Sequence, residues 1–186
     1  AVLIATPEDI HYDPCMKAID AGYHVLLEKP IAQNLAECND IAEHAKRKGV
    51  LVCVCHVLRY HPYFRKIKEV VDSGELGKII SISHIASVGL DRTTHGFVRG
   101  LWRKEKLTNP MLIAKCCHDV DLLLWLTKTP CRKLSSFGSL RWFRSENAPE
   151  GSSERCIDCS VETECPYSAV DLYYNRRSWI SNFDIP

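Results

Sequence analysis

Three short apolar runs, each ending in polar residues, constrain the fold of this chain more than any other feature. The runs and the residues that follow them are 1–5 with Thr6-Pro7, 23–27 with Glu28-Lys29-Pro30, and 50–55 with His56. Helical patterns separate the runs, and the order strand, helix, strand, helix, strand is the βαβαβ unit with parallel strands. Because the carboxyl ends of parallel strands share one edge, we expect the three polar tips to meet where ligands bind.

This unit corresponds to half of a nucleotide-binding sheet, since a full dinucleotide-binding domain contains two such units. The chain begins inside a strand without Met, and no Gly-x-Gly-x-x-Gly motif occurs in it. We therefore expect residues 1–58 to be a partial dinucleotide-binding domain that lacks the half with the phosphate-binding backbone. These residues alone should bind a dinucleotide weakly.

The rest of the chain predicts a second, α+β domain over residues 59–186. A helical pattern ends at Gly74, residues 78–88 and 133–143 alternate as strands do, and a further helical stretch follows Pro110. The expected fold class is therefore α/β: the C-terminal half of a Rossmann-type parallel sheet, followed by part of an α+β open-sheet domain.

Charge and composition exclude several classes of partner. The net charge is +1 and charged residues make up 25% of the chain, so there is no electrostatic reason to expect nucleic acid or an acidic membrane surface. No apolar run is long enough to span a bilayer, and no signal peptide is visible. We expect a cytoplasmic protein that acts on a small molecule.

Lys29 is the strongest catalytic candidate, because it stands at the tip of the second strand between Glu28 and Pro30. A lysine held there by a proline turn can point into the cleft, where partial desolvation suits it to donate or accept a proton. Glu28 can hydrogen-bond a ribose or hold the lysine in place. The alternative is a solvated turn with a chance charge pair.

The irregular stretch 89–109 is rich in His, Arg and Trp, and such loops on a rigid scaffold carry substrate sites. Arg99 can bind hydroxyls or a carboxylate through its planar guanidinium group. Trp102 offers a flat ring on which a sugar or a nicotinamide can stack. Both residues are therefore candidates for substrate binding, and an ordinary folded loop is the alternative.

Three of the ten cysteines, Cys156, Cys159 and Cys165, form a compact group in the segment 156–165. The C-x2-C spacing is usual for one side of a metal site, and C-x5-C adds a third thiolate. We favour a structural zinc ion that clips a long insertion, although no fourth ligand is evident nearby. An iron–sulfur cluster, unligated thiols and a local disulfide stay open as alternatives.

Several motifs occur in the order found in the Gfo/Idh/MocA family of NAD(P)-dependent sugar and cyclitol dehydrogenases, which the chain resembles over about its first 130 residues. The motifs are Ile4–Pro7 with His11, Ala21–Ala32, Val54–Tyr60, Ser73–Ile79 and His118–Asp121. The resemblance implies NAD or NADP as cofactor and a sugar or polyol as substrate. It also implies that the full-length protein is a homo-oligomer.

The resemblance also implies roles for individual residues. Those that would line or face the dinucleotide are Thr6, Pro7, His11, Glu28, Lys29, Pro30 and Arg59. Lys29 would handle the proton of the reacting hydroxyl, and His118 would hydrogen-bond that hydroxyl. The family usually has an aspartate one helical turn before this histidine, where this chain has Ala114. Lys115 is the candidate that would take over as substrate ligand or proton relay.

The sequence therefore favours an oxidoreductase that moves a hydride between a nicotinamide cofactor and a sugar or cyclitol hydroxyl. Lys29, His118 and Lys115 would act on the hydroxyl proton. One alternative uses bound NAD as a transient oxidant for net glycoside hydrolysis or epimerisation. Another is a non-enzymatic protein that senses metal or redox state through the cysteine group, although sensing would not require both Lys29 and His118.

Overall fold

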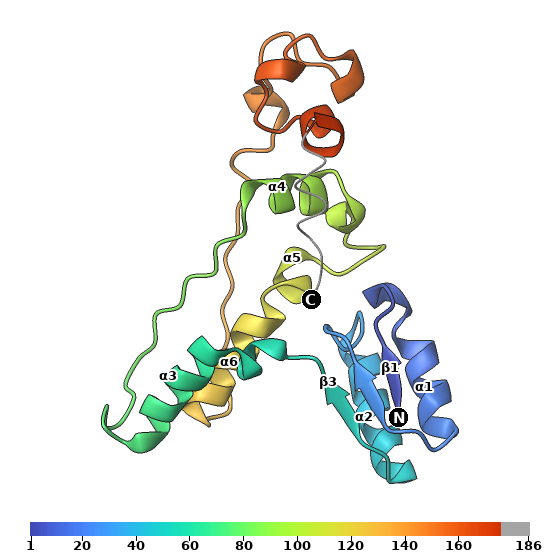
Figure 1. Cartoon of the computed structure of the whole chain (residues 1–186), viewed down its shortest axis with the longest axis vertical. Coiled ribbons are helices and arrows are strands. Elements are labelled where there is room, and N and C mark those ends of the chain that lie inside the picture. The colour runs from blue at the N-terminus through green and yellow to red at the C-terminus, as the bar shows by residue number, and fades with distance from the viewer. Residues whose placement is uncertain (176–186) are drawn as a thin grey trace. The chain divides into compact units, whose positions relative to one another are not determined.

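The computed structural model describes residues 1–175, and the chain divides into two compact units (Figure 1). The first unit contains Ala1–Ser87 and Trp102–Lys133. The second contains Val88–Leu101 and the described residues from Leu134 onward. The domain boundary that the sequence suggests at residue 58 stays a prediction.

A three-stranded parallel sheet is the frame of the first unit. Its strands are β1 (Val2–Ile4), β2 (Val25–Leu27) and β3 (Val52–Val54), in the order β1-β2-β3. Two helices connect them, α1 (Tyr12–Asp20) and α2 (Leu35–Lys48). The observed order is the βαβαβ unit, which confirms the α/β fold class and the Rossmann-type parallel sheet.

Local sequence signals set the ends of α2 as expected. The Asn34 side chain accepts a hydrogen bond of 2.9 Å from the Glu37 amide, which caps one of the orphan N–H groups of the first turn. Gly49 ends the helix with a φ of 66°, a left-handed conformation that glycine adopts without steric cost.

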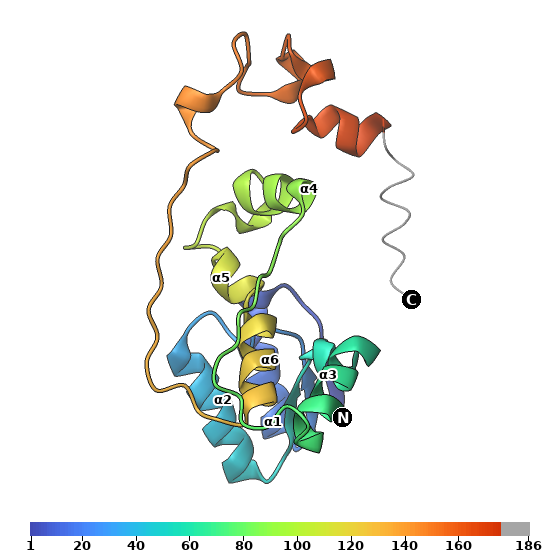
Figure 2. The ribbon, with the colours of Figure 1, turned by 90° about the vertical axis from the view of Figure 1, so that its left-hand side faces the viewer.

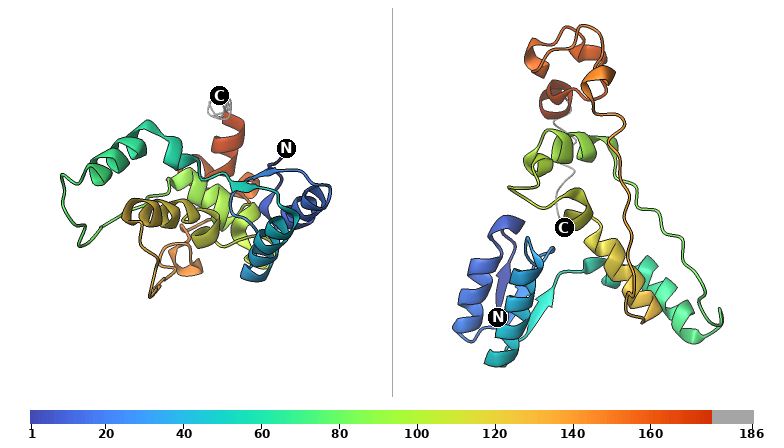
Figure 3. Two further views of the ribbon diagram at one scale, coloured as in Figure 1. Left: turned by 90° about the horizontal axis from the view of Figure 1, so that it is seen from below. Right: turned by 180° about the vertical axis from the view of Figure 1, so that it is seen from behind.

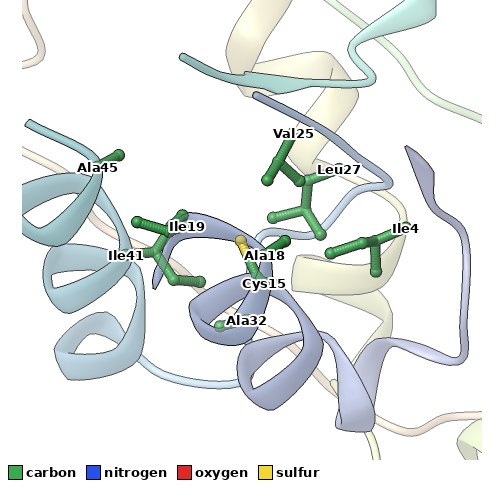
Figure 4. Packing of buried hydrophobic residues seen from close by; sticks show 9 residues of the cluster. All are labelled: Ile4, Cys15, Ala18, Ile19, Val25, Leu27, Ala32, Ile41 and Ala45. Atoms are coloured by element: carbon green, nitrogen blue, oxygen red, sulfur yellow. The ribbon is translucent and has the colours of Figure 1, made fainter. Parts of the chain in front are cut away.

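The hydrophobic core lies between the sheet and the two helices (Figure 4). Ile19 of α1 and Leu27 of β2 are fully buried, and Ile41 of α2 is almost so. Burying side chains of this size stabilises the unit by about 1.5–3 kcal/mol each. The cluster consists of Ile4, Cys15, Ala18, Ile19, Val25, Leu27, Ala32, Ile41 and Ala45.

The opposite face of the sheet is exposed. Leu3, Leu26 and Cys53 stand side by side across the three strands, and Leu3 is 64% and Leu26 42% exposed. The apolar runs are typical of strands covered on both faces, but the described residues cover only the face toward α1 and α2.

Beyond the sheet, the first unit adds four helical elements. These are η2 (Val57–Tyr60), α3 (Pro62–Ser73), α5 (Met111–Ala114) and α6 (Cys117–Thr127). α3 and α6 lie side by side (Figure 2), since Lys68 of α3 lies over the Trp125 ring at 5.6 Å and Asp72 pairs with Lys128 at 3.0 Å. The single helix expected after Pro110 is thus two helices, interrupted at Lys115 and Cys116.

The strands expected over residues 78–88 and 133–143 are not formed, so this detail of the prediction is wrong. Both segments are extended, but neither is assigned to a sheet (Figure 3). Their amides donate no hydrogen bond to any residue that the structure describes. Alternation of apolar and polar residues specifies a face, but a strand also needs a partner that accepts its hydrogen bonds.

The second unit consists of short helical turns. They are α4 (Leu90–Arg92), η3 (Thr93–Val98), η5 (Ser145–Asn147), η6 (Cys156–Asp158), η7 (Glu162–Glu164) and η8 (Asp171–Asn175), while η4 (Leu101–Arg103) spans the junction of the units. Gly100 is required where η3 ends, because a Cβ there would lie 1.9 Å from the His95 carbonyl oxygen.

Candidate active site

The tips of β1 and β2 are joined by one buried histidine. His11 is only 1% exposed, its Nδ1 lies 2.9 Å from the Pro30 carbonyl oxygen, and its Nε2 lies 3.0 Å from that of Thr6. One ring nitrogen of the neutral imidazole donates to one of these carbonyl oxygens, and the ring lies between the backbone of the two loops. The contacts with a dinucleotide implied for Thr6, Pro7 and His11 stay predictions.

Lys29 reaches from the tip of β2 to the helix interruption. Its Nζ donates a hydrogen bond of 2.9 Å to the Ala114 carbonyl oxygen, and its backbone amide donates one of 3.1 Å to Glu28 Oε2. Ala114 ends α5, where helix carbonyls lack intrahelical donors, so the lysine satisfies one of them. The peptide bond between Lys29 and Pro30 is cis.

His118 lies in the first turn of α6, with its Nδ1 buried and without a hydrogen-bond partner among the described residues. Its ring meets that of His56, at the tip of β3, edge to face at 5.7 Å. Burial lowers the pKa of His118 below its ordinary value of 6.5, and the positive charges of Lys29, His56 and Lys115 lower it further. Lys29 and Lys115 therefore lie near enough to His118 for their positive charges to disfavour its protonated form.

Arg59 of η2 contacts two residues of α6. Its Nε donates to Asp121 Oδ2 at 2.7 Å and its Nη2 to Oδ1 at 2.6 Å, while the guanidinium lies over the Trp125 ring at 5.8 Å. The hydrogen bonds to Asp121 raise the pKa of Arg59. This planar, two-point contact fixes the helix that carries His118 against the tip of β3. The cofactor contact implied for Arg59 stays a prediction.

Glu8 is a residue that sequence reasoning missed. Its side chain is largely buried, and Oε1 accepts hydrogen bonds from Trp102 Nε1 at 2.8 Å and from the Asn109 amide at 3.1 Å. The carboxylate therefore fixes Trp102 and the start of α5 against the tip of β1. Only the position of Glu8 directly after the first strand tip could have singled it out.

An apolar cavity of about 520 Å³ lies beside these residues. Its walls come from the loop after β2, the start of α2, the tip of β3, and helices α5 and α6. Most of the lining is apolar, and polar atoms come from Gln33, Asn34, His56, Cys117 and Asp121. Burial raises the pKa of the Cys117 thiol, so this cysteine is neutral at physiological pH.

The remaining candidates lie in the second unit. Arg99 Nη1 donates to Cys156 Sγ at 3.1 Å, so this guanidinium lies next to the cysteine group. In residues 1–175, no group of three or more His, Cys, Asp or Glu side chains is arranged to hold a metal ion. The expected zinc site at Cys156, Cys159 and Cys165 is therefore not supported, and these cysteines are free thiols. The substrate contact of Arg99 stays a prediction.

Two family models match successive parts of the chain. One, described as an oxidoreductase family with an NAD-binding Rossmann fold, matches residues 1–56. The other, described as the GFO/IDH/MocA C-terminal domain, matches residues 64–164. The chain belongs to the Gfo/Idh/MocA oxidoreductase family, as the motifs in its sequence indicate.

Individual relatives agree with this assignment. The scyllo-inositol 2-dehydrogenase (NADP+) IolW of Bacillus subtilis is 37% identical over 130 residues, which are 69% of this chain and 35% of IolW. The 2,7-anhydro-N-acetylneuraminate hydratase of Mediterraneibacter gnavus is 32% identical over 126 residues, which are 68% of this chain and 33% of the hydratase. The chain spans between 24% and 40% of the length of the curated relatives compared with it.

A solved structure shows the same fold. The myo-inositol 2-dehydrogenase of Lactobacillus plantarum superposes with a TM-score of 0.56 and is 25% identical, over 68% of this chain and 37% of that one. This likeness supports the parallel sheet and the helices that follow it as parts of a larger oxidoreductase fold.

Proposed function

We propose that the full-length protein is an NAD(P)-dependent oxidoreductase that moves a hydride between the nicotinamide ring and a hydroxyl of a sugar or cyclitol. The observation that carries this proposal is the hydrogen bond of Lys29 to the Ala114 carbonyl oxygen, one helical turn before His118 in the sequence. Lys29 comes from the tip of β2, hydrogen-bonds the residue that ends α5, and lies close enough to His118 to lower the pKa of the imidazole. Membership of the family and its inositol dehydrogenases support the reaction class.

The edge of the sheet fits the nicotinamide end of such a cofactor. His56 and His118 each have a buried Nδ1 without a hydrogen-bond partner in the described part of the chain, so polar groups there await a ligand. Glu28 and Lys29 stand at a strand tip, where α/β sheets hold dinucleotides. When bound, the cofactor supplies the hydride chemistry.

The protein residues handle the proton and the charge. His118 is neutral at pH 7, since its pKa is lowered, and so it can accept the hydroxyl proton as the carbon is oxidised. The Lys29 ammonium group, beside it, stabilises the negative charge that develops on the substrate oxygen. Lys115 adds a second positive charge near His118, which favours it as a substrate ligand in a chain with Ala114 at the place of the usual aspartate.

Steady-state kinetics of the full-length protein with NAD or NADP and a panel of cyclitols and sugars test this proposal. Lys29→Met should lower kcat by at least about 100-fold, the typical contribution of a positioned proton-handling group. Lys46→Met, on the exposed last turn of α2, is the matched control and should leave kcat unchanged. Equal turnover by the Lys29→Met variant would contradict the assigned role.

A second reaction class uses the same residues. The relative from Mediterraneibacter gnavus is named a hydratase, which favours a reaction without net oxidation in which a bound nicotinamide is only a transient oxidant. Two measurements distinguish the classes. A dehydrogenase releases NADH or NADPH in proportion to product, whereas an enzyme of the second class retains its nicotinamide and accumulates none.

The proposal also includes a homo-oligomeric assembly and a cytoplasmic location for the full-length protein. No helix in residues 1–175 is long and apolar enough to cross a membrane. Sedimentation of the full-length protein tests the homo-oligomer that the resemblance implies, and cell fractionation tests the cytoplasmic location.

A further inference from the structure

Cys156 and Cys159 stand at the two ends of one tight turn. η6 covers Cys156–Asp158, and the Cys159 amide donates a hydrogen bond of 3.3 Å to the Cys156 carbonyl oxygen. The Cα atoms of residues three apart lie within about 7 Å in a turn closed by this hydrogen bond, and disulfides span about 4.4–6.8 Å between Cα atoms. The turn therefore brings the backbone positions of Cys156 and Cys159 near the range that a disulfide spans.

The surroundings of Cys156 favour reaction at its sulfur. Arg99 Nη1 donates to Cys156 Sγ at 3.1 Å, and the Ala169 amide donates to the same sulfur at 3.5 Å. An adjacent arginine is a usual neighbour of reactive cysteines. Neither cysteine is fully buried, and both are free thiols.

A cavity of about 760 Å³ gives small molecules access to this pair. Cys156, Cys159, Arg99 and Tyr173 all line it, and so does Cys165. This volume is in the range that pockets for small molecules usually have.

We propose that Cys156 and Cys159 form a redox-active dithiol that a small-molecule disulfide oxidises. The Cys156 sulfur attacks one sulfur of the small disulfide, its S–S bond breaks, and the departing sulfur takes up a proton to leave as a thiol. The Cys159 thiol loses its proton and attacks Cys156 in the mixed disulfide, which releases the second small thiol. The protein loses two electrons and two protons, and the small disulfide gains them. The proposal stands apart from hydride transfer at the sheet edge.

Titration of the full chain with glutathione disulfide, followed by mass spectrometry, tests the pair. No Lys or Arg lies between Cys156 and Asn175, so trypsin leaves all three cysteines in one peptide. Cleavage before Asp158 and after Glu162 separates them. We expect a loss of two hydrogens, with the bond mapped to Cys156 and Cys159 and reversed by excess reduced glutathione. A bond from Cys156 to Cys165, or glutathione that stays on Cys156, would overturn the proposal.

Alkylation rates measured in the same chain test the role of Arg99. Iodoacetamide should label Cys156 roughly tenfold faster than Cys131, an exposed cysteine whose sulfur has no arginine donor in the described residues. Arg99→Gln should remove most of this difference, whereas Arg99→Lys should keep part of it. Cys165→Ser should still form the disulfide. Equal rates at Cys156 and Cys131, or stoichiometric zinc that leaves all three thiols unreactive, would overturn the proposal.

Discussion

The surroundings of His118 make the stability of the folded chain depend on pH. Burial and the charges of Lys29, His56 and Lys115 lower its pKa in the folded chain below the 6.5 of an exposed histidine. As pH falls below about 6.5, the unfolded chain therefore takes up this proton before the folded chain does. The contribution of His118 to stability is complete above that pH and is lost as pH falls toward the lowered folded pKa.

We predict that the chain is less stable at about pH 5.5 than at about pH 7.5, and that His118→Gln reduces this difference. Urea unfolding at the two pH values measures it, and titration of the His118 ring protons by NMR reports the pKa directly. His24→Gln replaces an exposed histidine whose Nδ1 accepts a hydrogen bond from the Leu51 amide, and it measures how much of the difference comes from a histidine outside the site. An equal loss of stability on acidification in the wild type and His118→Gln would show that other groups dominate.

The sequence predicts Lys29 and His118 as site residues but does not reveal Glu8. The reason is that the contacts of Glu8 are with residues distant in the sequence. Lys29 follows a strand and precedes a proline, so its place at the carboxyl edge of the sheet is visible within a few residues. The partners of Glu8 are Trp102 and Asn109, roughly a hundred residues away along the chain. No pattern near Glu8 reveals contacts of that separation.

At the scale of elements, Glu8 couples the turn after β1 to the start of α5. Glu8→Ala should leave the Trp102 indole and the Asn109 amide without their acceptor, at a cost of about 2 kcal/mol in the free energy of unfolding. Glu8→Gln keeps an oxygen acceptor and should lose less. Urea unfolding measures both, with Asp9→Ala, exposed on the same turn, as a control that changes stability by less than about 0.5 kcal/mol. Equal stability of Glu8→Ala and Asp9→Ala would refute the coupling.

The contact between η2 and α6 is a second coupling of elements. Asp121→Asn should break the two-point contact with Arg59 and lower the free energy of unfolding by about 1 kcal/mol, since Arg59 is partly exposed and water screens the pair. Glu69→Gln removes a largely exposed partner of Lys66 and should have no measurable effect. If the unfolding midpoint shifts no more for Asp121→Asn than for Glu69→Gln, the contact between Arg59 and Asp121 does not stabilise the packing of η2 on α6.

The helices show which local signals carry structural information. Asn34 and Gly49 mark the ends of α2 because capping and left-handed conformations have strong residue preferences. The interruption at Lys115 and Cys116 carries no glycine or proline, so the continuous apolar pattern predicts one helix where the structure has two. Ala114 ends α5 at this interruption, and its carbonyl oxygen accepts the hydrogen bond from Lys29.

At the scale of the whole molecule, the order of strands and helices could be predicted, whereas the pairing of extended segments could not. The parallel sheet follows from its own short connections, because each βαβ crossover brings its two strands together. Residues 78–88 and 133–143 have the alternation of strands, but alternation does not specify a partner. The described residues provide no such partner, so the apolar side chains of Ile80, Ile85 and Phe137 are more than four-fifths exposed.

Hydrogen exchange of the 186-residue chain measures the difference between the paired strands and the unpaired extended segments directly. Amides of residues 78–88 donate no hydrogen bond within the described part of the chain, so we expect them to exchange at nearly the rate of an unstructured peptide. Amides of Val25, Leu27 and Ile19 lie in or against the sheet and should exchange only through global unfolding. Protection of residues 78–88 comparable to that of Leu27 would show that this segment is paired, and that the apolar alternation in the sequence already specified a strand.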